Sequence, residues 1–313
     1  MESLPRLLAD HPYLLALVAA APFLALVYAD YRAYVAMGPH GLPDNLQGYI
    51  KQLKMRRVSR RDTTVPVPYD DDNGKTKTTG KIRAGSGETS ERARRSFFHL
   101  PSSSSEKDVG RWELTTRPGE GGSSSSSSSR PRLSHFIAPQ RQLEGGATAA
   151  MKRDMNAFLD ALAAANGEVL LRGLSRFEGT VPAVQAAEGK AAAAVTKETR
   201  GEILHVHPAD GSTHMVLSLV DSRRVIETGW GERHGLSGGG FLPWGYTLGE
   251  FFPIRPRLPL QRVTVVLLTI KPLVIVYAPR DGHDLAVWKK LAVAAMRYCA
   301  TEVGEIRMPG GCC

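Results

Sequence analysis

The first strong hydrophobic pattern is an apolar run near the N-terminus. Nineteen uncharged residues, mostly Leu, Ala, Val and Phe, lie between Asp10 and Asp30. As a helix they would extend about 28 Å, which is close to the roughly 30 Å of a hydrocarbon core. We therefore predict an N-terminal transmembrane helix over about 11–29, within a membrane-anchor and juxtamembrane segment formed by residues 1–58.

Charges flank this run unequally. Acidic and basic residues are mixed before it, whereas six basic residues follow between Lys51 and Arg61. The positive-inside bias then places the N-terminus outside or in a lumen and the remainder in the cytosol. We expect a single-pass protein of the endoplasmic reticulum or another endomembrane, with membrane lipid as a partner and a cytosolic folded domain. A cleaved signal peptide or a buried helix are the alternatives.

A polar, low-complexity stretch separates this anchor from the rest of the chain. Residues 59–130 contain repeated Thr and Ser, including seven serines at 123–129. Such a composition buries too little apolar surface to offset the entropy of ordering, so we predict a disordered linker. Short apolar islands at 96–100 and 111–114 could dock on the folded domain.

From residue 131 the pattern becomes that of a globular domain, which we assign to 131–308, before a flexible Cys-terminated tail at 309–313. Helical spacing of apolar residues predicts helices over 148–166 and 284–301. Alternation or β-prone runs predict strands at 169–174, 202–207, 213–220, 224–230 and 273–280. The predicted fold class is α+β, with a mainly antiparallel sheet flanked by helices.

Four of the nine histidines fall within 201–240. His205 and His207 are two apart in a strand pattern and so share a face. Asp210-Gly211 predicts a tight reversal, and the return strand would bring His214 back to them. This histidine hairpin is the best sign of chemistry in the chain.

Three interpretations of the histidines stay open. They can act as acid–base groups on an acidic small molecule, because imidazole titrates near neutral pH. His205, His207 and His214, with Glu202 or His234, could instead hold a metal ion. The third interpretation is that they are structural. We expect no organic cofactor and treat a metal as the weaker alternative.

A second polar stretch, Gly229 to His234, supplies further candidates. Arg233 could hold an anionic or enolic oxygen, and Trp230 could stack on a flat ring. The candidate catalytic residues are His205, His207, His214, Arg233 and His234. The candidate substrate-binding residues are Glu202, Trp230, Glu232 and Arg280.

Composition narrows the class of partner. The formal charge of +9 indicates an anionic neighbour, either membrane or nucleic acid. No zinc-finger spacing, RNP-type strand or base-reading basic helix occurs in the sequence, so we expect no nucleic acid and favour a membrane. Three cysteines cannot build a disulfide framework, and no phosphate loop, nucleophile elbow or dinucleotide fingerprint is present.

Four stretches in order resemble the fungal luciferase family. They are Asp30-Tyr31-Arg32 with Gly38-Pro39 and Gly48-Tyr49-Ile50; Glu202-Ile203 with His205, His207 and His214; Gly229 to His234 with Leu236 and Gly238; and Tyr277-Ala278-Pro279-Arg280 before a helix. The resemblance implies O₂-dependent oxygenation of a small phenolic or α-pyrone substrate of the 3-hydroxyhispidin type. O₂ is then a co-substrate, and a peroxide that loses CO₂ leaves an excited product.

Two features depart from the family pattern. The Ser-rich linker replaces a compact connection, and residues 249–272 intervene before the last strand, as an insertion or as an artefact of the gene model. The resemblance does not imply light emission. A non-luminous luciferase-like domain that binds or transforms another small hydrophobic ligand, or a metal-dependent enzyme, is the alternative.

Overall fold

The computed structural model describes residues 12–38, 40–66, 92–98, 113–119, 130–187, 193–196, 199–237, 273–300 and 305–309. Its centre is a sheet of six strands in the order β1-β2-β3-β4-β6-β5. The strands are β1 (Leu170–Leu174), β2 (Pro182–Ala186), β3 (Glu202–Val206), β4 (Thr213–Val216), β5 (Gly231–Arg233) and β6 (Leu273–Val276). Every described pair is antiparallel, which confirms the predicted α+β class.

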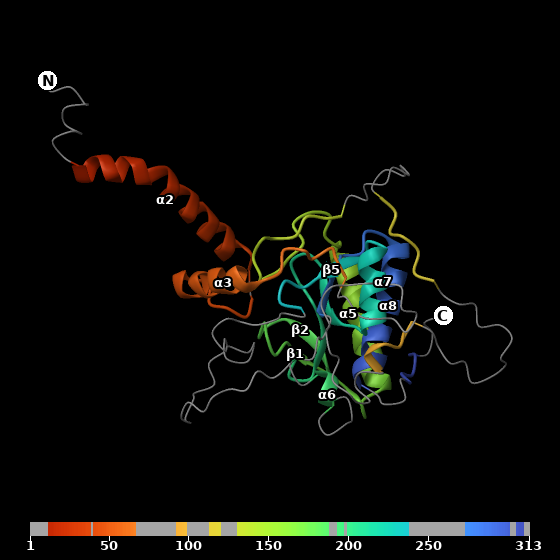
Figure 1. Ribbon diagram of the computed structural model, residues 1–313. Helices are drawn as coiled ribbons and strands as arrows, with labels where there is room; N and C mark the ends of the chain where they lie inside the picture. The colour runs from red at the N-terminus through yellow and green to blue at the C-terminus, as the bar shows by residue number, and fades with distance from the viewer. Residues whose placement is uncertain are drawn as a thin grey trace, which may run out of the picture.

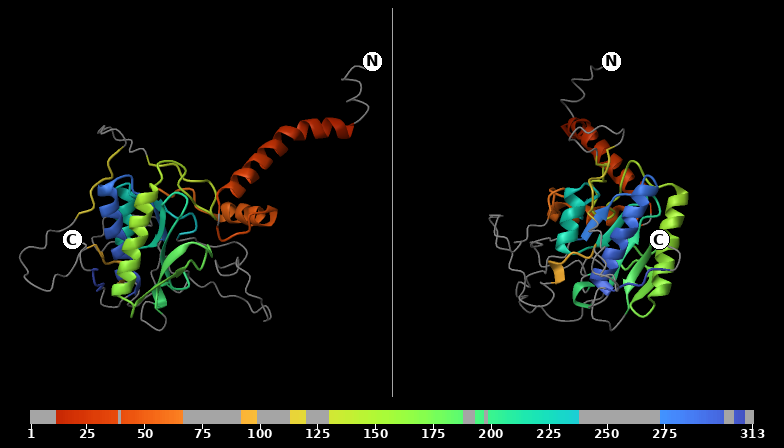
Figure 2. Two further views of the ribbon diagram at one scale, coloured as in Figure 1. Left: turned by 180° about the vertical axis from the view of Figure 1, so that it is seen from behind. Right: turned by 90° about the vertical axis from the view of Figure 1, so that its right-hand side faces the viewer.

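Three helices form a layer on one face of this sheet, as both views of Figure 2 show. They are α5 (Ala149–Ala165), α7 (Leu219–Glu227) and α8 (Gly282–Ala300). The short helix α6 (Ala193–Thr196) lies between β2 and β3. Thr148 caps α5 by accepting a hydrogen bond from the Met151 N–H, as expected for an N-cap threonine. The predicted helices at 148–166 and 284–301 are therefore confirmed.

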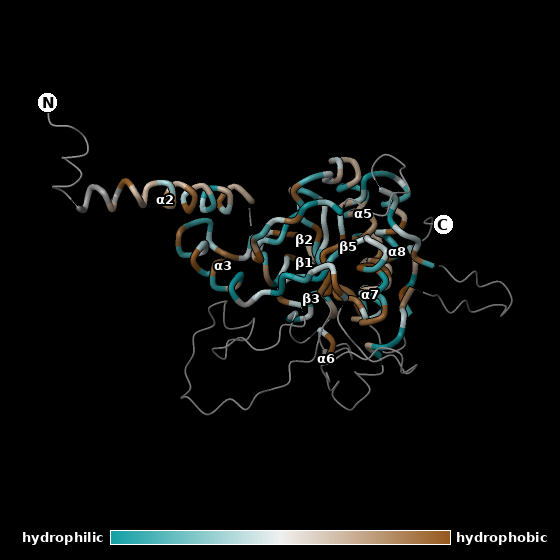
Figure 3. The backbone as a smooth tube through the Cα atoms, turned by 45° about the horizontal axis from the view of Figure 1, so that its top comes forward, coloured by the Kyte–Doolittle hydropathy of each residue, from teal (hydrophilic) through white to brown (hydrophobic). Residues whose placement is uncertain are grey.

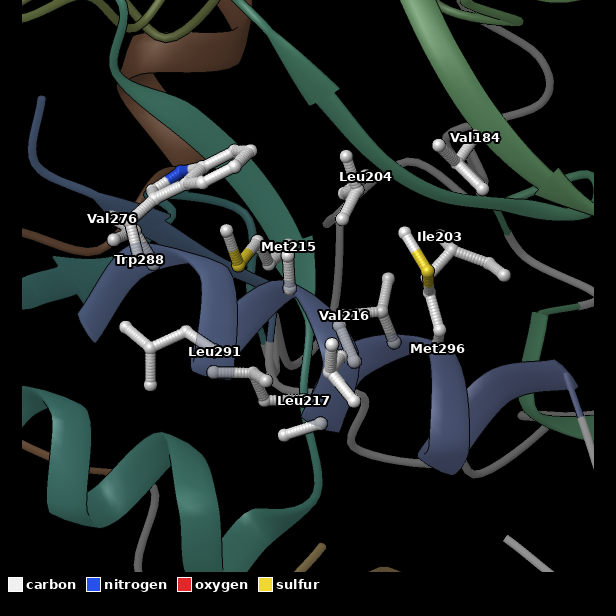
Figure 4. Packing of buried hydrophobic residues seen from close by; sticks show 14 of the residues in the cluster. Val184, Ile203, Leu204, Met215, Val216, Leu217, Val276, Trp288, Leu291 and Met296 are labelled. Atoms are coloured by element: carbon white, nitrogen blue, oxygen red, sulfur yellow. The ribbon is translucent and has the colours of Figure 1, made fainter. Parts of the chain in front are cut away.

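The apolar core lies between the sheet and this helical layer. Leu204 and Met215 from the central strands pack against Trp288, Leu291 and Met296 of α8 (Figure 4). The Trp288 Nε1–H donates to the Thr213 hydroxyl at 2.9 Å, so the one polar atom of this large side chain is satisfied. The residues that this face of the sheet contributes to the core are mainly apolar.

The histidine hairpin forms as predicted. Leu204 pairs with Met215, and His205 lies directly opposite His214. The reversal between the strands uses Gly211 at a φ of +82°, a conformation that glycine adopts without steric cost. An added Cβ there would also approach the Ala147 Cβ to 2.7 Å.

A β-bulge interrupts β3 on its other edge. Val184 of β2 pairs with Leu204 and the next residue, Gln185, pairs with Glu202, so Ile203 is an extra residue. Ile203 and Leu204 both lie in the apolar core and are each 1% exposed. A bulge of this kind re-aims the flanking side chains. Glu202 and His205 therefore lie on the same face, although residues three apart in a regular strand point to opposite faces.

The return strand predicted at 213–220 is confirmed over half of its length, and the strand predicted at 224–230 is wrong. Strand β4 ends at Val216, and the region predicted to be a strand at 224–230 is mostly the helix α7. Ser218 caps this helix by accepting a hydrogen bond from the Asp221 N–H. Val225 and Ile226 are β-prone, but here they bury one side of a helix whose other side is polar.

The N-terminal helices lie on the side of the sheet opposite to α5 and α8 (Figures 1 and 2). They are α2 (Pro12–Ala36) and α3 (Leu46–Val58). A small apolar cluster joins them to the domain: Tyr34, Leu42, Tyr49, Met55, Phe136 and Ile137. The Tyr49 hydroxyl donates to Asp30 at 2.7 Å, so two of the motifs that carried the family resemblance meet here.

The predicted transmembrane helix is not supported by the described residues. Helix α2 covers most of 11–29 and extends to Ala36, with Pro22 inside it. Within the part of the chain that the structure describes, no helix combines the length and the apolar character needed to cross a membrane. Figure 3 nevertheless shows apolar stretches along α2, which projects away from the body.

Parts of the predicted linker pack on the domain. Residues 92–98 lie along α7 and α8: Asp221 accepts hydrogen bonds from the Ser96 hydroxyl and the Phe97 N–H, and Arg92 donates to the Tyr298 carbonyl. Leu114 is buried in the main core. The intervening stretches and the 249–272 segment lie outside the described residues.

Candidate functional site

The four histidines of the hairpin region form one buried cluster on the sheet face opposite to α8. His205, His207 and His214 have ring centroids 4.6 to 5.1 Å apart, and His234 lies 4.9 Å from His214. None is more than 7% exposed. The strands therefore bring together the four histidines that the sequence predicted, and two of them lie side by side across β3 and β4.

His205 is fixed by Glu202. The His205 Nδ1 lies 2.5 Å from the Glu202 Oε1, and this contact exists because the bulge puts both side chains on one face. The carboxylate also accepts hydrogen bonds from the Ser175 hydroxyl and the Arg176 N–H. Glu202 was predicted to bind substrate, but these contacts make it a residue that orients His205.

His207 is fixed in a similar way from the turn. Its Nδ1 lies 2.8 Å from the Ser212 hydroxyl oxygen, and the Ser212 N–H donates to Asp210. The Nε2 atoms of His207 and His205 then face each other at 3.2 Å. The two rings thus present the same atom to a common centre.

Glu178 faces that centre and was not predicted. Its Oε1 lies 3.6 Å from the His205 Nε2 and 4.0 Å from the His207 Nε2. Arg141 holds the carboxylate in a bidentate ion pair, with 3.0 and 2.5 Å between nitrogen and oxygen atoms. Both partners are buried, and such a pair tolerates burial only when its geometry is good and its hydrogen bonds are satisfied.

His214 supplies the one unsatisfied group of this trio. Its Nε2 is buried and, among the described residues, has no hydrogen-bond partner. A buried ring nitrogen without a partner costs stability and in a native protein calls for an explanation. A proton, a ligand atom or a metal ion in the centre would provide one.

His234 differs from the other three. Its Nδ1 accepts a hydrogen bond from the Leu236 N–H at 3.2 Å, so that atom carries the lone pair and Nε2 carries the proton. The ring also bonds to the Ile137 backbone, and burial lowers the pKa of His234 to about 4 in spite of that bond. His234 is therefore a neutral ring that packs against His214 with both nitrogens engaged.

The charges and the burial of the site give the histidines different pKa values. Burial lowers the pKa of His205, but the charges of Glu178 and Glu202 outweigh it and raise that pKa to about 9. Burial, aided by the charge of Arg141, lowers the pKa of His207 to about 4. Burial and the neighbouring histidines hold the pKa of His214 well below its usual value. At neutral pH the site combines one imidazolium with neutral imidazoles.

Arg233 and Glu232 make their contacts elsewhere. The Arg233 guanidinium donates to the Ser237 carbonyl at 3.0 Å, and its backbone N–H donates to the Thr63 carbonyl. Glu232 accepts hydrogen bonds from the Tyr277 and Thr63 hydroxyls, both at 2.6 Å. These contacts link β5 to the segment after α3. They give the predicted catalytic role of Arg233 and the predicted substrate role of Glu232 no support.

Trp230 and Arg280 both contact residues 113–119, away from the histidine cluster. The Trp230 Nε1–H donates to the Thr115 carbonyl at 2.7 Å, and Arg280 donates to the Pro118 carbonyl and pairs with Asp284. Both anchor residues 113–119 against the end of the sheet. The preceding Gly229 has a φ of +81°, and a Cβ on Gly231 would approach the Ile275 carbonyl oxygen to 2.4 Å. The Gly-Trp-Gly motif is thus accounted for by packing.

Comparisons with known proteins give matches that include the region of the histidine cluster. A family profile described as a luciferase domain matches residues 200–295, the stretch from the histidine hairpin to α8. The matched stretch contains the four histidines of the cluster, together with β5 and β6.

The chain is also similar to individual luciferases of fungi. The chain is 23% identical to a luciferase of Armillaria mellea and to one of Armillaria ostoyae, in each case over 91% of this chain and 86% of the relative. A luciferase of Armillaria gallica is 28% identical over 34% of this chain and 31% of the relative. No solved structure matches the chain. These findings confirm the predicted resemblance to the fungal luciferases.

Proposed function

We propose that this protein catalyses the O₂-dependent oxygenation of a small, enolisable phenolic or α-pyrone compound at the histidine cluster. The observation that carries the proposal is the pairing of a His205 imidazolium with an unpartnered, neutral His214 in one buried site. Similarity to luciferases supports the choice of chemistry.

The two rings suit the two demands of such a reaction. A neutral His214 can accept the acidic hydroxyl proton of the substrate through its free Nε2. A His205 imidazolium can then stabilise the oxyanion that forms, which is the role that the sequence had suggested for Arg233. Glu202 keeps the His205 ring oriented during both steps.

Access to the site requires movement of its cover. The Ile137 backbone contacts both His234 and Gln52 of α3, and the Gly235 N–H bonds to Gln140. Because the histidines are almost fully buried, an organic substrate reaches them only when this cover of α3 and residues 131–147 shifts.

Membrane attachment is the second part of the proposal. Six described apolar or aromatic residues of α2 are more than a third exposed: Val18, Phe23, Leu24, Leu26, Val27 and Tyr28. This exposed apolar stretch stops just before Asp30. The Asp30 carboxylate contacts the Tyr49 hydroxyl and the His135 ring, and so joins the helix to the domain. The basic residues of α3 would lie beside the lipid headgroups. Release of the protein from membranes by mild salt or alkali would contradict this part.

The test is O₂ uptake and light output from membranes that contain the protein, supplied with 3-hydroxyhispidin. We expect uptake that His214→Gln abolishes and that the matched variant of an exposed histidine, His283→Gln, leaves unchanged. Light would accompany uptake in a luciferase, and uptake without light indicates a dark oxygenase. Absence of uptake from the folded protein overturns this substrate class and favours a domain that binds or transforms another hydrophobic ligand.

A further inference from the structure

We propose that Glu178, His205, His207 and His214 form a binding site for a divalent first-row transition metal ion. The inference rests on the proposed function in that both use the same cluster. Coordination requires a neutral His205 and occupies the His214 Nε2, so in the metal-bound protein the ion would take over the charge-stabilising and proton-accepting roles given above to these two rings. Glu178 is the main reason for this inference, because it adds a carboxylate to the three histidines and so completes a set of four ligands. Three imidazoles with one carboxylate suit ions such as Zn²⁺ or Fe²⁺.

The separations between the donor atoms fit a single ion. One ligand atom from each of the four residues lies within 4.8 Å of all the others. The His205 Nε2 lies 3.2 Å from the His207 Nε2 and 3.6 Å from the Glu178 Oε1. An ion with ligand bonds of about 2.1 Å holds its ligands about 3.0 Å apart at right angles and about 3.4 Å apart in a tetrahedron. Small side-chain shifts would therefore complete the coordination.

The surrounding hydrogen bonds are those that metal-ligating histidines require. A ligating histidine usually donates its other ring N–H to a carboxylate or another oxygen, which fixes the ring. His205 has Glu202 at its Nδ1, and His207 has the Ser212 hydroxyl at its Nδ1. Each ring is thereby held with Nε2 toward the centre. Arg141 orients the Glu178 carboxylate in the same manner.

The unpartnered nitrogen is an independent sign of a missing ligand. His214 is 5% exposed, and its Nε2 is among the few buried side-chain atoms with no hydrogen bond within the described residues. Burial without a partner is costly, and coordination to an ion would remove that cost. The fourth histidine has no such free atom, because both nitrogens of His234 are engaged.

The experiment measures metal binding directly and needs no substrate. The purified full-length protein is stripped with a chelator, titrated with Zn²⁺ or Co²⁺, desalted and analysed for metal by mass spectrometry. We expect one ion per chain, a higher Tm, and ligand-field absorption from the Co²⁺ form. Glu202→Gln should weaken binding about 10- to 100-fold, as loss of an orienting partner does. The double variant Glu178→Gln/His214→Leu should lose binding.

Two control variants separate this site from other histidines. His234→Gln and the exposed His283→Gln should retain one ion each, and circular dichroism should show that every variant is folded. Absence of stoichiometric metal in the folded wild type, or equal binding by the double variant, overturns the proposal. Metal binding without O₂ uptake would leave it intact while refuting the oxygenase function. Histidine-dependent uptake by a metal-free protein would do the reverse.

Discussion

The two faces of the central sheet are both buried, but they differ in how their polar groups are satisfied. On the helical face, Leu204 and Met215 pack against α8, and even the indole N–H of Trp288 has its partner. On the opposite face, four imidazoles, Glu178 and Arg141 are buried together, and the His214 Nε2 has no partner among the described residues. The first face stabilises the fold, and the second stores unsatisfied polar groups that can be used in chemistry.

The largest expected effect comes from opening a cavity in the helical face. Trp288→Ala removes a fully buried ring and its hydrogen bond, so we expect the free energy of unfolding to fall by about 3–5 kcal/mol. Urea denaturation followed by circular dichroism measures it. Trp288→Phe is the matched control and should cost clearly less, because most of the ring volume remains. Equal losses in the two variants would show that the hydrogen bond, not the packing, dominates.

Asp221, a buried carboxylate in α7, predicts a pH dependence of stability. Burial raises the pKa of Asp221 to about 6, although hydrogen bonds from Ser96 and Phe97 oppose the shift. Above that pH the folded state must hold the charge, so this group's contribution to stability is present below about pH 4 and is lost as the pH rises through 6. The expected loss is roughly 2–3 kcal/mol.

Asp221→Asn isolates this effect from other titrating groups. The amide can accept from the Phe97 N–H and donate to the Ser96 hydroxyl, so residues 92–98 stay docked. Relative to the wild type, the variant should gain stability as the pH rises from about 4 to about 6, the unfolded and folded pKa values of Asp221, and should keep a constant advantage at higher pH. A difference between the proteins that does not change with pH would refute the assignment.

The sequence was most informative where contacts are local. Alternation and the Asp210-Gly211 turn predicted the hairpin and the meeting of His205 with His214. Local propensity failed for α7, because the β-branched Val225 and Ile226 can also pack on one side of a helix capped by Ser218. Strand β2 had no alternation that distinguished it and was not predicted.

Long-range partners explain what was missed in the site. Arg141 and Glu178 are 37 positions apart, and Glu178 belongs to the turn between β1 and β2, so no periodic pattern connects them to the histidines. The orienting role of Glu202 depends on the bulge at Ile203, and a regular strand would have placed it on the other face. The one available signal in the sequence for this ligand was that Glu178 is an acidic residue in a turn, directly before Gly179.

The smallest expected change in stability is the sharpest test of the difference between the two faces. Removing a buried side chain should destabilise the protein on the helical face, whereas on the histidine face it should leave stability unchanged or raise it. His214→Leu replaces a buried ring with an unpartnered nitrogen by an apolar side chain that can fill most of the same space. We expect the free energy of unfolding to stay constant or to rise by about 1 kcal/mol, while O₂ uptake and metal binding are lost. His214→Ala is the matched control: it removes the same nitrogen but leaves a cavity, so it should destabilise the protein by about 1–3 kcal/mol. A loss of more than about 2 kcal/mol in His214→Leu would mean that the ring is a structural member of the sheet, in which case the histidine face is a second core and not a site held at the expense of stability.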